Sequence, residues 1–144
     1  MRTRCAAHVP AIALALFALP SCGELLQDLS GGTFQSNMVV DGHAWAPAQC
    51  VSGDFETFRG VDLIDSSGSK IRLVKEVDGS PTMILFAAGA EVGATLRVCL
   101  SLRLEHTGVR VNNIRVVKGA ASFRCVGPEG QRIVGDITFR CGIP

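Results

Sequence analysis

The sequence has few of the residues from which metal centres and acid–base sites are commonly built. Its 144 residues include three histidines, one tryptophan and no tyrosine. None of the six cysteines is spaced as Cys-x2-Cys, and only His43 and His106 follow residue 22, so no zinc cluster is expected. The motifs Gly-x-Ser-x-Gly and His-Glu-x-x-His and a phosphate-binding loop are absent. We therefore expect no enzyme activity, no metal and no cofactor.

The sequence also lacks an excess of charge of one sign. Its 14 lysines and arginines face 13 aspartates and glutamates. Loss of Arg2 and Arg4 with a leader would leave a net charge of about −1. This near-neutral balance argues against nucleic acid as a partner. The hydrophobic share of 47% is typical of a globular protein, and the length fits one domain.

No hydrophobic run is long enough to cross a bilayer, which takes about 20 apolar residues. The apolar run at residues 11–19 follows a basic start at residues 1–4 and is typical of a signal peptide. It ends in Leu19-Pro20-Ser21-Cys22, which resembles the lipobox of bacterial lipoproteins. The resemblance implies that residues 1–21 are removed, that the Cys22 sulfur takes a diacylglycerol and that its new amine is acylated. We therefore expect the membrane to be a partner through lipid on Cys22.

Residues 22–33 are expected to form a flexible tether. Ser30-Gly31-Gly32 is unfavourable for a continuing helix. About ten extended residues reach about 35 Å, which keeps the following domain near its membrane. Lipoproteins retained in the inner membrane typically carry aspartate after the lipidated cysteine, whereas Gly23 resembles the class sorted to the outer membrane. We expect a lipid-anchored protein of the cell envelope, in the outer membrane, with a non-enzymatic binding or structural role.

The cysteine count predicts two disulfides in the mature protein. Cys5 leaves with the leader, and Cys22 takes the lipid. An even number then remains in an exported chain, where disulfides form and persist. These four are Cys50, Cys99, Cys125 and Cys141.

Strand geometry favours one pairing of these four cysteines. A hairpin at Gly127-Pro128-Glu129-Gly130 would leave Cys125 and Cys141 about 30 Å apart, well beyond the reach of a disulfide. A meander through 94–105, 109–118 and 120–125 would place one strand between Cys99 and Cys125. The sequence therefore favours Cys50–Cys125 together with Cys99–Cys141.

The regular spacing of turn signals in residues 34–144 is typical of a β-domain. The turn signals are Asp41-Gly42, Ser67-Gly68, Asp78-Gly79, His106-Thr107-Gly108 and Gly127-Pro128-Glu129-Gly130. Strands are expected between them at 34–40, 44–49, 60–65, 70–76, 82–87, 94–105, 109–118, 120–125 and 132–141. Between residues 96 and 104, leucines alternate with polar residues, as in an antiparallel sheet with one buried face. We expect an all-β antiparallel sandwich or small barrel of eight or nine short strands, braced by two disulfides.

Two segments resemble small exported bacterial β-domains of no established activity. The segments are Val40-Asp41-Gly42-His43-Ala44-Trp45 and Val134-Gly135-Asp136-Ile137-Thr138-Phe139. The resemblance implies a fold and export but no chemistry. Gly42-x-x-Trp45 also invites comparison with the Gly-x-Trp signature of lipocalins. The alternative functions are thus a small-molecule-binding barrel, with Trp45 in the core or in a pocket wall, and an envelope enzyme.

Several polar residues invite a catalytic interpretation. Ser67-Gly68-Ser69-Lys70 matches the Ser-x-x-Lys nucleophile motif, but that chemistry needs the serine at the start of a helix. Here the residues fall between expected strands, so we interpret them as a hairpin turn. We expect His43 and His106 to be turn or surface residues. The acidic pairs are expected to be solvated; they are Asp54 with Glu56 and Asp62 with Asp65.

Basic side chains are concentrated in the last third of the sequence. Residues 97–144 hold eight basic and three acidic side chains. Six arginines alternate there with apolar residues and should share the polar face of their strands. Five of these arginines form a candidate anion-binding face. The sixth is Arg110. The partner of this face would be an anionic envelope component or an acidic protein. The five are Arg97, Arg103, Arg115, Arg124 and Arg140.

Overall fold

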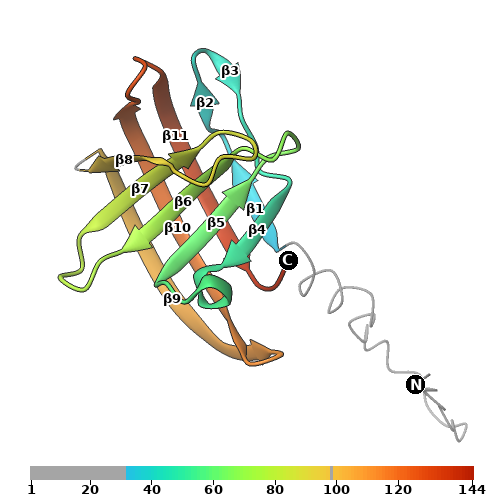
Figure 1. Cartoon of the computed structure of the whole chain (residues 1–144). Helices are drawn as coiled ribbons and strands as arrows, with labels where there is room; N and C mark the ends of the chain where they lie inside the picture. The colour runs from blue at the N-terminus through green and yellow to red at the C-terminus, as the bar shows by residue number, and fades with distance from the viewer. Residues whose placement is uncertain (1–31, 98) are drawn as a thin grey trace, which may run out of the picture.

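The computed structural model describes residues 32–97 and 99–144 (Figure 1). The leader and Cys22 therefore lie outside the described residues. One sheet contains β1 (Thr33–Ser36), β2 (Val39–Val40), β3 (His43–Ala44), β9 (Leu100–Val111), β10 (Ile114–Val126) and β11 (Arg132–Cys141). The other contains β4 (Gln49–Ser52), β5 (Gly60–Ile64), β6 (Lys70–Lys75), β7 (Pro81–Phe86) and β8 (Ala94–Arg97). A short 3-10 helix, η1 (Gly53–Glu56), follows β4.

The two sheets are antiparallel and face each other as a sandwich (Figure 1). The first sheet has the order β3-β2-β11-β10-β9, and β1 also pairs with β11. The second has the order β4-β5-β6-β7-β8. The expected all-β antiparallel fold with two disulfides is confirmed, and the sheets do not close into a barrel. The described residues form eleven strands rather than the expected eight or nine short ones, and β9 and β10 are long, with 12 and 13 residues.

The core lies between the sheets and follows from the alternation along each strand. On β10, Ala121 and Phe123 point inward and are buried, and they pair across the sheet with Leu102 and Leu100 of the expected leucine stripe. The second sheet contributes side chains that are wholly removed from water, such as Leu73 of β6. Burying one such side chain stabilises the fold by about 1.5–3 kcal/mol. The core therefore uses one face of each sheet.

Most of the expected turns form hairpins. Asp41 and Gly42 have positive φ values of 50° and 80° and join Val40 to its partner His43, as a two-residue type I′ turn requires. Three of the other expected turns are longer hairpin turns that also contain a glycine at positive φ, which only glycine adopts without a steric penalty. These glycines are Gly68, Gly79 and Gly130.

The prediction of a turn at His106-Thr107-Gly108 is wrong, because these residues belong to β9. Val117 pairs with His106 and Arg115 with Arg110, so β9 carries extra residues there and forms a bulge. The chain instead reverses at Asn112-Asn113, where φ is 49° and 67° and Val111 pairs with Ile114. As a result β9 and β10 are long, adjacent strands.

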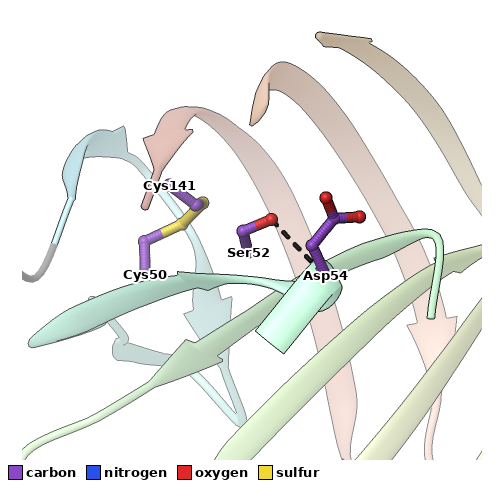
Figure 2. The surroundings of a disulfide bond; sticks show 4 residues. All are labelled: Cys50, Ser52, Asp54 and Cys141. Atoms are coloured by element: carbon purple, nitrogen blue, oxygen red, sulfur yellow. Dashed lines mark hydrogen bonds between the residues drawn. A yellow bond between two sulfur atoms is a disulfide. The ribbon is translucent and has the colours of Figure 1, made fainter. Parts of the chain in front are cut away.

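The favoured disulfide pairing is also wrong. The structure joins Cys50 to Cys141 and Cys99 to Cys125, with Cα atoms 4.9 Å apart in each pair. Because no strand separates β9 from β10, the backbone N–H of Arg124 donates to the carbonyl of Cys99 at 2.9 Å, which places Cys99 beside Cys125. The exclusion of Cys125–Cys141 is correct, since Cys125 pairs with Ile133 at the other end of β11. Figure 2 shows the Cys50–Cys141 bridge; Cys50 is in β4, the strand that directly precedes η1 in the chain.

Candidate functional site

A hollow of about 320 Å³ lies at one end of the sandwich, beside the single tryptophan. Its volume is at the lower end of the range of about 300–1,000 Å³ that is usual for small-molecule sites. We call it the Trp45 hollow. It is lined by Val40, Trp45, Asp65, Ser69, Lys70, Ile71, Leu85, Phe86, Gln131 and Ile133.

Trp45 is held in place by the β2–β3 hairpin. The tight Asp41-Gly42 turn brings the chain back beside β2, and the Trp45 backbone N–H donates to the carbonyl of Met38 at 2.8 Å. The half-buried indole packs against the core, and its Nε1–H donates to Oδ2 of Asp65 at 3.2 Å. Trp45 therefore serves both as a core residue and as a wall of the hollow.

Asp65 presents a fixed negative charge at the rim of the Trp45 hollow. Its Oδ1 accepts hydrogen bonds from the backbone N–H and hydroxyl of Ser67, at 2.8 and 2.7 Å, and from the backbone N–H of Ser69 at 3.0 Å. Burial alone would raise the pKa of the Asp65 carboxyl, but the bonds from Ser67, Ser69 and Trp45 outweigh it and lower that pKa. The Ser67-Gly68-Ser69-Lys70 segment is a hairpin turn, as expected, and here it orders this carboxylate.

The floor of the Trp45 hollow is apolar and its rim is polar. Ile71 and Ile133 at the floor are buried core residues. At the rim, the Lys70 ammonium lies 4.5 Å from the centre of the Phe86 ring and 3.5 Å from an oxygen of Asp62. The hollow can thus hold a compact apolar group, with the Asp65 carboxylate offering a partner to a hydrogen-bond donor.

The arginines of the candidate anion-binding face do not all share one surface. By alternation, Arg103, Arg124 and Arg140 lie on the outer face of the first sheet. Two acids interrupt the positive charge there: Glu105 contacts Arg103 and Lys118, at 3.6 and 3.2 Å, and Asp136 accepts a hydrogen bond from Ser122. Arg115 lies beyond the bulge and pairs with Asp54 instead, and the side chain of Arg97 lies outside the described part of the structure.

The expectation that Asp62 and Asp54 are solvated is wrong, because each carboxylate is paired with an arginine: Asp62 with Arg72 and Asp54 with Arg115. Asp62 is 4% exposed and accepts two hydrogen bonds from Arg72, at 2.8 and 2.7 Å. Arg72 also contacts Glu56, and its guanidinium carbon lies 4.2 Å from the centre of the Phe58 ring. Hydrogen bonds from Arg72 to Asp62 raise the pKa of Arg72, against the opposing effect of burial, and Glu56 adds to the rise. No signal in the sequence links these residues, which come from separate strands and η1.

Neither a metal cluster nor a membrane-spanning helix is present in residues 32–97 and 99–144. No group of three or more histidine, cysteine, aspartate or glutamate side chains is arranged to hold a metal ion there. No helix in this part of the chain has the length and apolar character needed to cross a bilayer. His43 is exposed on β3, and its Nδ1 lies 3.0 Å from the carbonyl oxygen of Asp41.

In comparisons with known proteins, no protein family, no curated protein and no solved structure matches this chain. Its residues and their geometry are therefore the basis for assigning a function.

Proposed function

We propose that this chain is a lipid-anchored protein of the cell envelope that acts by binding through its β-sandwich. The observation that carries this proposal is the pair of disulfides, Cys50–Cys141 and Cys99–Cys125. Disulfides form and persist in oxidising compartments and are rare in the cytosol. The lipobox-like segment that ends at Cys22 supports export and lipid attachment at that cysteine, and Gly23 after it favours the outer membrane.

The position of the first disulfide suits a tethered domain. Thr33 at the start of β1 pairs with Arg140, next to Cys141. The backbone N–H of Ser52 donates to the carbonyl of Gly142 at 2.7 Å, so β4 lies against the same end of β11. The chain therefore enters the sandwich at the end that Cys50–Cys141 braces. A tether attached there would place this end toward the membrane.

The anchor is tested by mass spectrometry of the protein from the membrane fraction. We expect an N-terminus at Cys22 that carries acyl chains, because the lipobox resemblance implies that modification. The substitution Cys22→Ser should block cleavage and lipid attachment, whereas the matched control Cys5→Ser, within the leader, should leave both unchanged. A soluble, unmodified mature chain that begins at another residue would refute the anchor.

A second candidate function is the binding of a small, mostly apolar molecule in the Trp45 hollow. The apolar floor and the fixed carboxylate of Asp65 favour a flat apolar group that carries a hydrogen-bond donor. Because the chain has one tryptophan and no tyrosine, its intrinsic fluorescence reports on Trp45. This hollow can therefore be probed without a label.

Fluorescence titration with 4-nitroaniline tests this second candidate. Its neutral ring fits the apolar floor, its amine can donate to Asp65, and it quenches tryptophan by energy transfer. We expect saturable quenching of Trp45 that is lost in Leu85→Phe, where the larger side chain fills the hollow. Glu91→Gln, a change outside the hollow, should bind as the parent does. Linear, collisional quenching of equal strength in all three proteins would count against a ligand site here.

A further inference from the structure

A second hollow, of about 570 Å³, lies at the opposite end of the sandwich. It is formed before the start of β5 and around the turn between β9 and β10, whereas the Trp45 hollow is formed where β5 ends and β11 begins. We call it the basic hollow. Its lining consists of Asp54, Thr57, Phe58, Arg59, His106, Arg110, Asn113 and Arg115.

Two features of the chain bring the basic side chains of this hollow together. The tight Asn112-Asn113 turn places Arg110 directly opposite Arg115 on neighbouring strands. On the other side, the chain turns at Thr57, whose φ is 65°, and carries Arg59 to the start of β5. The hollow is thus built from both sheets, and its residues are far apart in the sequence.

Asp54 and Arg115 connect the two sides of the basic hollow. Oδ2 of Asp54 accepts hydrogen bonds from Nε of Arg115 at 2.7 Å and from its backbone N–H at 3.2 Å. Partial burial would raise the pKa of the Asp54 carboxyl, but the bonds and charge of Arg115, with a contribution from His106, outweigh it and lower that pKa. Asp54 is therefore ionised at neutral pH, and its negative charge is compensated by the ion pair with Arg115.

The remaining positive charge of the basic hollow has no partner within the described structure. The side chains of Arg59 and Arg110 make neither a hydrogen bond nor an ion pair with any residue of 32–97 or 99–144. The three arginines and one aspartate give the lining a formal charge of +2 with His106 neutral. Like charges directly opposite each other on neighbouring strands are destabilising, as Arg110 and Arg115 are here. The hollow therefore favours a multivalent anion.

From this arrangement we infer that the basic hollow binds a phosphate group, either the phosphate monoester of a lipid headgroup or free phosphate. Guanidinium groups form paired, charge-assisted hydrogen bonds with phosphate oxygens. A phosphate dianion balances the formal charge of +2, whereas a single carboxylate would leave half of it unbalanced. The Thr57 hydroxyl and the Asn113 amide line the same hollow and can donate to further oxygens. The space exceeds that of one phosphate ion, so a phosphate monoester, which also carries close to two negative charges at neutral pH, fits as well.

The basic hollow lies at the end of the sandwich where the chain enters it. Ser52, directly before η1, bonds to Gly142 near the C-terminus, and Thr33 pairs with Arg140 close by. Figure 1 shows η1, the β9–β10 turn and the C-terminus at this end. The lipid source of the phosphate rests on the proposed anchor, because only a tethered domain would hold this end near headgroups. Phosphate binding itself does not require the anchor.

Isothermal titration calorimetry of the purified full chain in a nonionic detergent tests this site. The probes are inorganic phosphate and glycerol 1-phosphate, with sodium chloride matched for ionic strength. We expect saturable binding that weakens about tenfold in Arg110→Gln and in Arg59→Gln, since each loses a charge-assisted contact. The control Arg132→Gln removes an exposed arginine far from the hollow and should bind as the parent does. Tighter binding of glycerol 1-phosphate would identify an esterified phosphate, and the reverse order would identify free phosphate.

Thermal unfolding provides a second measurement that separates binding from folding. Without phosphate, Arg110→Gln should melt at or above the temperature of the parent, because it relieves repulsion with Arg115 and breaks no ion pair. At about ten times the dissociation constant, phosphate should raise the melting temperature of the parent by about 4–7 °C and that of Arg110→Gln by less. The inference is overturned by the absence of saturable phosphate binding up to about 20 mM, by equal weakening in Arg132→Gln, or by binding of succinate in preference to phosphate. An unmodified Cys22 would remove the anchor without affecting these results.

Discussion

At the scale of single residues, Asp62 and Arg72 form an ion pair that is largely removed from water. The side chain of Asp62 is 6% exposed and that of Arg72 is 17% exposed. The two-bond geometry, the Phe58 ring beneath the guanidinium and the further contact of Arg72 with Glu56 compensate both charges. A buried pair of this kind contributes little net stability compared with apolar residues, but losing one partner leaves an uncompensated buried charge. The pair should therefore respond asymmetrically to mutation.

We expect Arg72→Ala to lower the free energy of unfolding by about 3–5 kcal/mol, because Asp62 stays buried without its main partner. Lys70, at 3.5 Å from Asp62, would compensate part of this loss. The control Arg103→Ala removes a side chain that is 76% exposed and 3.6 Å from Glu105, and should cost less than about 1 kcal/mol. Urea unfolding of the three proteins measures the difference. Similar losses in both variants would show that the buried pair has no special role.

At the scale of strands and turns, the sequence predicts structure where one residue type has a strong conformational preference. Asp41-Gly42 was correctly predicted as a turn because its glycine tolerates positive φ. The reversal at Asn112-Asn113 was missed because two asparagines are a weaker signal than the glycine of His106-Thr107-Gly108 nearby. That glycine, with a φ of 78°, forms a bulge inside β9 rather than a turn. One misplaced turn then excluded the true partner of Cys99.

The candidate sites show a similar limit of prediction from the sequence. Trp45 stands out in the sequence because Gly42-x-x-Trp45 is similar to the Gly-x-Trp signature of lipocalins, but its partner Asp65 lies 20 residues away across the sandwich. Arg110 and Arg59 of the basic hollow were not placed together, because the bulge and the Asn112-Asn113 turn that position Arg110 were not predicted. Strand alternation gives the face of a residue but not the register between strands, and sites are assembled by register.

At the scale of the whole molecule, the two disulfides join both edges of the second sheet to the first. Cys50 lies on the edge strand β4 and is bonded to Cys141 of β11. Cys99 follows the opposite edge strand, β8, and is bonded to Cys125 of β10. A sandwich that is not closed by hydrogen bonds can separate along these edges. The disulfides therefore brace the sides at which the sheets are open.

The two disulfides should differ in how much they stabilise the fold. Cys50–Cys141 closes a loop across 91 residues and Cys99–Cys125 across 26. In the chain-entropy description these loops correspond to about 4.6 and about 3.5 kcal/mol of stabilisation, because the longer loop removes more freedom from the unfolded chain. We expect Cys50→Ala/Cys141→Ala to lower the free energy of unfolding by about 1 kcal/mol more than Cys99→Ala/Cys125→Ala does. Urea unfolding of both double variants measures this, after peptide mapping of the non-reduced parent has confirmed the pairing. A larger loss for Cys99→Ala/Cys125→Ala would mean that local packing at the β8–β9 crossing, and not the restriction of the unfolded chain, determines how the sandwich is held together.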